Sequence, residues 1–151
     1  MNTKAFIRCL HPVIISIAVA VASFFCMRHG SRAWDFSPIL SDAIIVSAFA
    51  VFLSFFFWIG MATNADSGTV KKLIDAGRGT EFWSIVKMAI RHPAYLVVLC
   101  MYFKMMGPGH RFSIIDSTAF IYFFLAAVLS CRASWMMCAE VIKDEAGISK
   151  R

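Results

Sequence analysis

The sequence predicts an all-α protein, an integral membrane bundle of four transmembrane helices with an amphipathic cytoplasmic segment before the third. Hydrophobic residues make up 60% of the 151 residues and charged residues only 16%, with a mean hydropathy of +0.72. Soluble domains are about half apolar and about a quarter charged. The apolar residues form runs close to the ~20 residues that a helix needs to cross ~30 Å of hydrocarbon. The strict alternation of ~10-residue strands that is typical of membrane barrels is not found in the sequence.

The first expected span, residues 12–27, follows a short basic start that contains Lys4 and Arg8. Signal peptides and uncleaved signal anchors both begin in this way. Because the apolar segment continues as far as Cys26, and the chain after it is itself apolar, we expect a first helix that remains uncleaved.

The second expected span, residues 39–62, is the clearest apolar run in the sequence. Small residues recur along it at helical spacing: Ala43, Ser47, Ala50 and Ser54. A face of small residues lets two helices approach closely in lipid. We expect this face to pack on a neighbouring helix, most simply the first, which offers Ser16, Ala20 and Ser23.

The third expected span, residues 86–106, follows a cytoplasmic loop over residues 63–85. Lys87 and Arg91 share one helical face with Thr80 and Ser84, which predicts a basic amphipathic segment suited to an anionic membrane surface. A kink or a break is expected where this segment meets His92 and Pro93. The apolar run after Pro93 is only about 20 Å long as a helix, so the span must include some of the preceding turns.

A tight connection rich in glycine and proline, residues 107–111, precedes the fourth expected span, residues 112–132. So short a connection predicts that the third and fourth helices are antiparallel neighbours. The remaining residues, 133–151, are expected to form a cytoplasmic tail that begins as a helix. The whole chain is then a single membrane domain.

The net charge of +6 reflects membrane topology rather than nucleic-acid binding, because Lys and Arg residues lie mainly between and beyond the apolar runs. With both termini in the cytoplasm, the cytoplasmic side receives Lys4, Arg8, Lys71, Lys72, Arg78, Lys87, Arg91, Arg132, Lys143, Lys150 and Arg151. The outer side receives only Arg28, Arg32, Lys104 and Arg111. The positive-inside rule therefore favours a multi-pass protein of a bacterial-type cell inner membrane with cytoplasmic N- and C-termini.

Among the ionisable residues of the expected spans, Asp42, Asp116 and Arg132 are the candidate intramembrane polar residues. Charges in lipid are costly and often functional. Asp42 and Asp116 are expected near the outer ends of their helices, where two carboxylates can share a cation or proton. The more common alternative is that each carboxylate reaches headgroup water or pairs with a nearby basic residue. Arg132 is expected to mark the cytoplasmic boundary.

The sequence predicts no cofactor, no metal site and no catalysis. His11, His29, His92 and His110 lie in four separate regions, without the helical spacing of a metal-binding pair. The five cysteines lack paired spacing and are interpreted as small apolar helix residues. The sequence also contains no phosphate-binding glycine loop and no nucleophile elbow.

Three classes of function are compatible with this sequence. In the favoured class, the protein binds another membrane protein, or itself, in an immunity, entry or surface exclusion, or accessory-subunit role. The alternative is a small oligomeric channel or transporter that uses Asp42 and Asp116. A membrane-embedded enzyme acting on lipid is the third class, for which no set of catalytic residues can be assembled.

Overall fold

The computed structural model describes residues 3–63, 71, 74–75, 77–107 and 111–145. In this part of the chain four long helices are found: α1 (Thr3–Gly30), α2 (Leu40–Thr63), α4 (Gly79–Met105) and α5 (Ile114–Glu145). A short 3-10 helix, η1 (Ser37–Ile39), precedes α2. Each long helix contains a stretch that is long and apolar enough to cross a membrane: Leu10–Gly30, Ser37–Gly60, Gly79–Met105 and Ile114–Met137. The protein is therefore an all-α membrane protein with four spans, as the sequence predicts.

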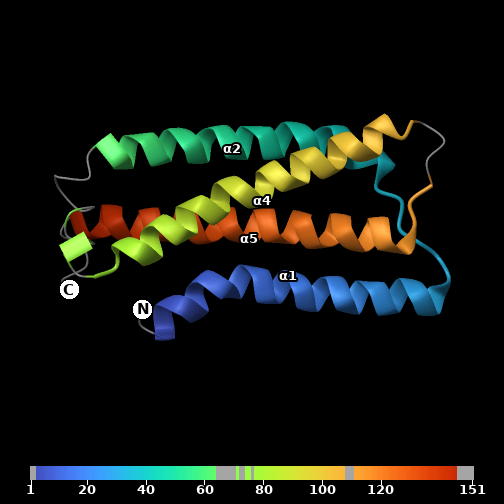
Figure 1. The fold of residues 1–151 in the computed structure, drawn as a ribbon, viewed down its shortest axis with the longest axis horizontal. Coiled ribbons are helices and arrows are strands. Elements are labelled where there is room, and N and C mark those ends of the chain that lie inside the picture. Colours follow the sequence, from blue (N-terminus) through green and yellow to red (C-terminus); the bar gives the residue numbers. More distant parts are fainter. Residues whose placement is uncertain (1–2, 64–70, 72–73, 76, 108–110, 146–151) are drawn as a thin grey trace.

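The helices α4 and α5 form the centre of the bundle, with α2 packed mainly on α4 and α1 mainly on α5. Figure 1 shows α4 crossing α5 obliquely between the two outer helices. The first turns of α1 and the last turns of α5 lie at one end of the bundle, here called the termini end. The opposite end, with residues 31–36 and the α4–α5 connection, is called the loop end. The predicted antiparallel pairing of the third and fourth helices is confirmed.

Two helices begin before the membrane spans that the sequence predicts. The helix α1 begins at Thr3 rather than at residue 12, because residues 3–11 contain no glycine or proline to stop it. Pro12 lies inside α1, where the Ser16 hydroxyl donates a 2.7 Å hydrogen bond to its carbonyl. Figure 1 shows the first turns of α1 bending away from the rest of the helix. The helix α4 begins at Gly79, before the expected span at residue 86, so the amphipathic segment expected from Thr80 is part of this helix and supplies the length that the third span needs.

Of the kink or break expected at His92 and Pro93, the break is not found, because α4 continues through both residues. Proline has no backbone N–H, so the carbonyl four residues earlier loses its helical donor. That carbonyl belongs to Ala89, and the Cys131 thiol of α5 donates to it across 3.9 Å. A weak donor from the neighbouring helix thus replaces part of the missing hydrogen bond.

The expected neighbour of the small-residue face on α2 is wrong, because this face packs on α4 rather than on α1. Ala43 and Ser47 are buried and Ala50 and Ser54 half-buried. Large residues of α4, including Leu96 and Phe103, share a buried cluster with Ala43 and fill the space that small side chains leave open. Ser16, Ala20 and Ser23 of α1 are also buried, on the helix whose main neighbour is α5.

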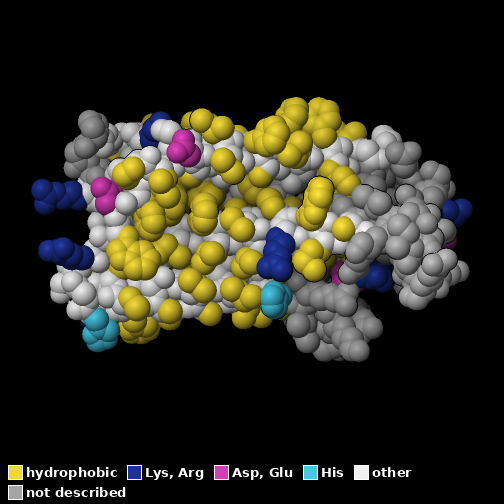
Figure 2. Space-filling model, turned by 180° about the vertical axis from the view of Figure 1, so that it is seen from behind, with side chains coloured by type: hydrophobic (Ala, Val, Ile, Leu, Met, Phe, Trp, Pro, Cys, Tyr) yellow, Lys and Arg dark blue, Asp and Glu magenta, His cyan; other side chains and the backbone are white. Residues whose placement is uncertain are grey.

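Buried apolar side chains form two clusters. The larger cluster joins α2, α4 and α5 through Leu40, Ala43, Leu96, Cys100, Phe103, Phe112, Phe120 and Ala127. The smaller cluster joins α4 and α5 toward the termini end through Phe82, Ile85, Val86 and Met137. Outside these clusters large apolar side chains face outward on all four helices. Figure 2 shows hydrophobic side chains covering most of one face between the two ends.

A candidate headgroup site between three helices

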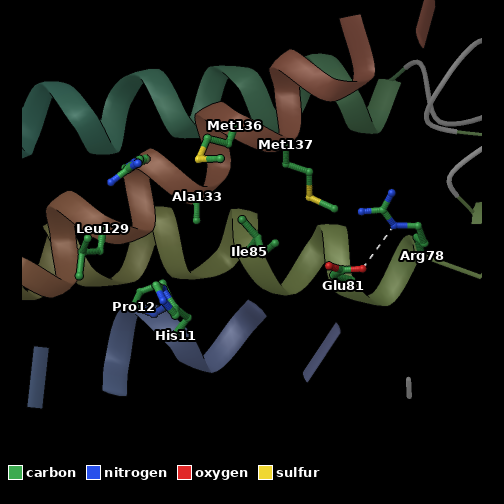
Figure 3. A pocket seen from close by; sticks show the side chains of 10 residues that line it. His11, Pro12, Arg78, Glu81, Ile85, Leu129, Ala133, Met136 and Met137 are labelled. Carbon is green, nitrogen blue, oxygen red and sulfur yellow. Dashed lines mark hydrogen bonds and ion pairs between the residues drawn. The ribbon is translucent and has the colours of Figure 1, made fainter. Parts of the chain in front are cut away.

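A cavity of about 460 Å³ lies between α1, α4 and α5 toward the termini end. Its lining consists of His11, Pro12, Arg78, Glu81, Ile85, Leu129, Arg132, Ala133, Met136 and Met137. Figure 3 shows that α1 contributes His11 and Pro12, whereas Arg78, Glu81 and Ile85 come from the start of α4. The remaining lining residues belong to α5. The cavity therefore depends on all three helices.

The lining has an apolar wall and a charged rim. Ile85, Leu129 and Met136 belong to the wall, while the guanidinium groups of Arg78 and Arg132 and the Glu81 carboxylate supply charge. Cavities that bind small ligands are typically about 300–1,000 Å³, mostly apolar and furnished with a few polar groups. This cavity therefore has the size and chemistry of a binding site for an amphiphile.

The Glu81 carboxylate is 93% buried and forms an ion pair with Arg78, with 3.4 Å between Nε of Arg78 and Oε2 of Glu81. Figure 3 shows this pair at one side of the cavity. Arg78 is the N-cap residue of α4, so Glu81 lies in the first turn, where the helix dipole also stabilises a negative charge. The buried carboxylate is thus neutralised by its surroundings.

Arg132 and His11 lie on the cavity with exposed side chains. Within the described residues, neither side chain has a hydrogen bond or an ion pair. The cavity thus has two polar groups that other parts of the described chain leave available to a ligand.

The two carboxylates considered for a shared outer site have different surroundings. Asp42 is exposed in the first turn of α2. Asp116 lies in the first turn of α5, where its Oδ2 accepts hydrogen bonds from the Ser113 backbone N–H at 3.0 Å and the Ser113 hydroxyl at 2.8 Å. The Ser113 oxygen in turn lies 3.1 Å from the backbone nitrogen of Asp116. This reciprocal arrangement is a capping box, which gives Asp116 a structural role.

The expected basic face lies on the outside of α4. Lys87 lines a second depression, of about 680 Å³, with Ile74, Gly77, Gly79, Thr80, Trp83 and Ser84. Arg91 donates a 3.1 Å hydrogen bond to the Tyr95 hydroxyl, and its guanidinium carbon lies 5.9 Å from the centre of the Tyr95 ring. Lys87 and Arg91 are both exposed, so this face is separate from the cavity.

At the loop end, hydrogen bonds and stacked rings fix residues 34–37 against α5. Asp35 accepts hydrogen bonds at Oδ1 from the Ser37 backbone N–H at 2.9 Å and the Ser37 hydroxyl at 2.6 Å. These two bonds lower the pKa of the exposed Asp35 carboxyl below its usual 3.8. Phe36 stacks on Phe120 with ring centres 4.5 Å apart. The Ser117 hydroxyl donates a 2.7 Å hydrogen bond to the Trp34 carbonyl.

Metal-binding geometry is not found in the described ranges, where no three His, Cys, Asp or Glu side chains come together. Cys26, Cys100 and Cys131 are free thiols. Cys131 contacts the Ala89 carbonyl and Cys100 is part of the larger apolar cluster. For these two residues the interpretation as helix-packing residues agrees with their positions.

Sequence reasoning identified Arg132 but missed the cavity around it. Arg78 and Glu81 fall within the expected cytoplasmic loop over residues 63–85, although Glu81 also falls within the amphipathic helical segment expected from Thr80. That amphipathic pattern is the signal that places Glu81 on α4. The approach of α1 to this region leaves no local signal, because His11 and Pro12 are distant in sequence.

Comparison of the chain with protein-family models, curated proteins and solved structures found no match. The function proposed below is therefore based on the four apolar helices and the cavity.

Proposed function

We propose that this protein is a small multi-pass membrane protein that acts by binding another membrane protein and catalyses no reaction itself. Its role would be of the immunity, entry or surface exclusion, or accessory-subunit type. The proposal includes a bacterial-type inner membrane with both termini in the cytoplasm, which is the orientation favoured by the distribution of Lys and Arg in the sequence.

The observation that carries this proposal is the sparse packing of α2. Only 11% of its span is buried, compared with 28%, 33% and 28% for the spans of α1, α4 and α5. Its outward face carries large side chains that are more than half exposed: Ile45, Val46, Phe49, Phe52, Leu53 and Phe56. Rigid aromatic side chains supply much of the contact energy in protein interfaces. This face, here called the α2 outer face, is the favoured contact surface.

The small-residue faces are less suitable as contact surfaces for a partner. Ala43 and Ser47 are buried in the contact between α2 and α4, and Ser16 and Ala20 are buried on α1. A partner would have to separate the bundle to reach any of them. The α2 outer face needs no such rearrangement.

The test is gentle extraction of the tagged protein from native membranes, followed by mass spectrometry of the proteins that co-purify at stoichiometric yield. The double variant Phe49→Ala with Phe52→Ala should reduce the recovery of a specific partner. Phe25→Ala is the matched control, because Phe25 is a similarly exposed aromatic residue on α1. A partner that is lost from the double variant and retained by the control supports the proposal.

Two outcomes would contradict the proposal. Recovery of the same partner with both variants would exclude the α2 outer face as the contact surface. A clean homo-oligomer would instead favour the channel or transporter, and flux through Asp42→Asn with Asp116→Asn would then be the decisive measurement. Normal flux in that double variant would exclude a path that depends on the two carboxylates.

A further inference from the structure

We propose that the cavity between α1, α4 and α5 binds the phosphodiester headgroup of an anionic phospholipid, with Arg132 as its main charged contact. The ligand is therefore a component of the membrane and not the protein partner proposed above. The depth of the cavity, its charge and the contrast between its rim and its wall support this assignment.

The depth of the cavity matches the headgroup boundary. His11 is the second residue of the apolar span of α1, Arg78 directly precedes that of α4, and Met137 ends that of α5. From Ile114 to Arg132 a straight helix rises about 27 Å, close to the ~30 Å thickness of the hydrocarbon. The three helices therefore bring their lining residues together near the boundary between the hydrocarbon core and the phosphate headgroups.

The charge of the lining matches a single negative charge. Arg78 and Arg132 are positive and Glu81 is negative, which leaves one positive charge when His11 is counted as neutral. Glu81 is already paired with Arg78 at 3.4 Å, whereas Arg132, the other basic residue of the lining, has no counter-charge among the described residues. A phosphodiester carries one negative charge, and guanidinium groups bind phosphate oxygens through paired hydrogen bonds.

The wall of the cavity suits the lipid chain beside the headgroup. Leu129, Ala133 and Met136 continue along α5, the helix that also carries Arg132. Pro12 of α1 and Ile85 of α4 add apolar surface from the facing helices. A lipid presents a phosphate, then a glycerol and then an acyl chain, which matches the change from charged rim to apolar wall in the cavity. Basic pockets between membrane helices bind lipid headgroups in this way.

The experiment measures lipid retention by the purified full-length protein in detergent, using native mass spectrometry with added phosphatidylglycerol or phosphatidylcholine. The wild-type protein should retain phosphatidylglycerol in preference to phosphatidylcholine. Arg132→Gln should weaken retention of phosphatidylglycerol about tenfold, because it removes the charge-assisted hydrogen bonds to the phosphate. Arg132→Lys should restore part of this retention through its charge alone.

Lys87→Gln is the matched control. It removes one exposed positive charge from α4 outside the cavity, so it tests general attraction of anionic lipid to the bundle. Its effect should be about twofold or less. Equal losses with Arg132→Gln and Lys87→Gln would overturn the proposal in favour of unspecific surface attraction.

A second variant keeps the test decisive if Arg132→Gln does not fold. Ala133→Leu adds volume to the cavity wall without changing charge, and it should also lower retention of phosphatidylglycerol while the helical circular dichroism is unchanged. Unaltered retention in this folded variant would contradict the proposal. Displacement of the lipid by an equal concentration of glycerol 3-phosphate would identify a site for soluble phosphate esters instead and would also overturn it.

Discussion

Asp116 is a charged residue within an expected membrane span, and it stabilises the start of α5 together with Ser113. The two side chains satisfy each other's backbone N–H groups at the start of α5, with distances of 3.0 and 3.1 Å. The first N–H groups of a helix have no partner within it, so they need such caps. Asp35 acts similarly before η1, where its carboxylate accepts two hydrogen bonds from Ser37. Both acidic residues lie at the loop end and organise turns.

Removal of the cap should destabilise α5. Ser113→Ala removes the side-chain acceptor for the Asp116 N–H and should lower the free energy of unfolding by about 1 kcal/mol. The measurement is unfolding by denaturant in detergent micelles, followed by circular dichroism. Ser41→Ala is the control, because Ser41 is exposed in the first turn of α2. Equal effects of the two substitutions would argue against the capping box.

Asp35 should make the loop end sensitive to acid. Its folded-state pKa is lowered, so the stabilisation is fully present above the unfolded value near 3.8 and is lost as the pH falls through the lower folded value. Titration of the Asp35 carboxyl by nuclear magnetic resonance should give a midpoint below 3.8, and Ser37→Ala should raise it toward that value. An unchanged midpoint in Ser37→Ala would contradict this account.

At the scale of helices, α4 and α5 are joined by polar contacts within an otherwise apolar contact surface. His92 Nδ1 lies 2.6 Å from the Ser130 hydroxyl, and the Cys131 thiol lies 3.9 Å from the Ala89 carbonyl that Pro93 leaves without its helical donor. Both contacts occur around Pro93, where α4 lacks one backbone hydrogen bond. Support from α5 explains why a break expected from local sequence is not found.

Loss of the His92 contact should weaken the pairing of α4 with α5. Ser130→Ala leaves one ring nitrogen without its partner and should cost about 0.6 kcal/mol and at most about 1.7 kcal/mol, as for side-chain hydrogen bonds between membrane helices. Unfolding in detergent micelles gives this difference, with Ser134→Ala as the control because Ser134 lies on the same helix but is less buried. A cost no greater than that of the control would indicate that the contact contributes nothing to stability.

At the scale of the whole molecule, four spans bring the first turns of α1 and the last turns of α5 to the same end of the bundle (Figure 1). The membrane side of that end is set by electrostatics, because Lys and Arg residues resist transfer across the membrane. Lys and Arg residues are more numerous at the termini end, which is why we propose that it faces the cytoplasm.

A reporter fused after Arg111 should test this orientation. Arg111 follows the α4–α5 connection at the loop end, which is expected outside the cytoplasm. Alkaline phosphatase should therefore be active there, and a cytoplasmic fluorescent protein should not fluoresce. The opposite pattern at Arg111, with a fusion after Arg151 as the reference, would reverse the proposed topology.

Much of the fold can be predicted from the sequence because the determining properties are local. Apolar runs define the four spans, and the short connection over residues 107–111 requires α4 and α5 to be antiparallel. The amphipathic pattern from Thr80 onward agrees closely with the start of α4 at Gly79, but it does not indicate that Glu81 is buried. In the folded protein Glu81 is buried and paired, so its polarity is compatible with a helix.

The sequence by itself determined the fold class, the number of spans and the distribution of charge, since each depends on hydropathy along a continuous segment. Only the tertiary structure decided that α2 packs on α4 instead of α1. It also brought His11, Glu81 and Arg132 to one cavity. Helix pairing in lipid depends on how side chains of different size fit together, and small residues occur on more than one helix. Residues far apart in the chain therefore acquire a common site only when the bundle has formed.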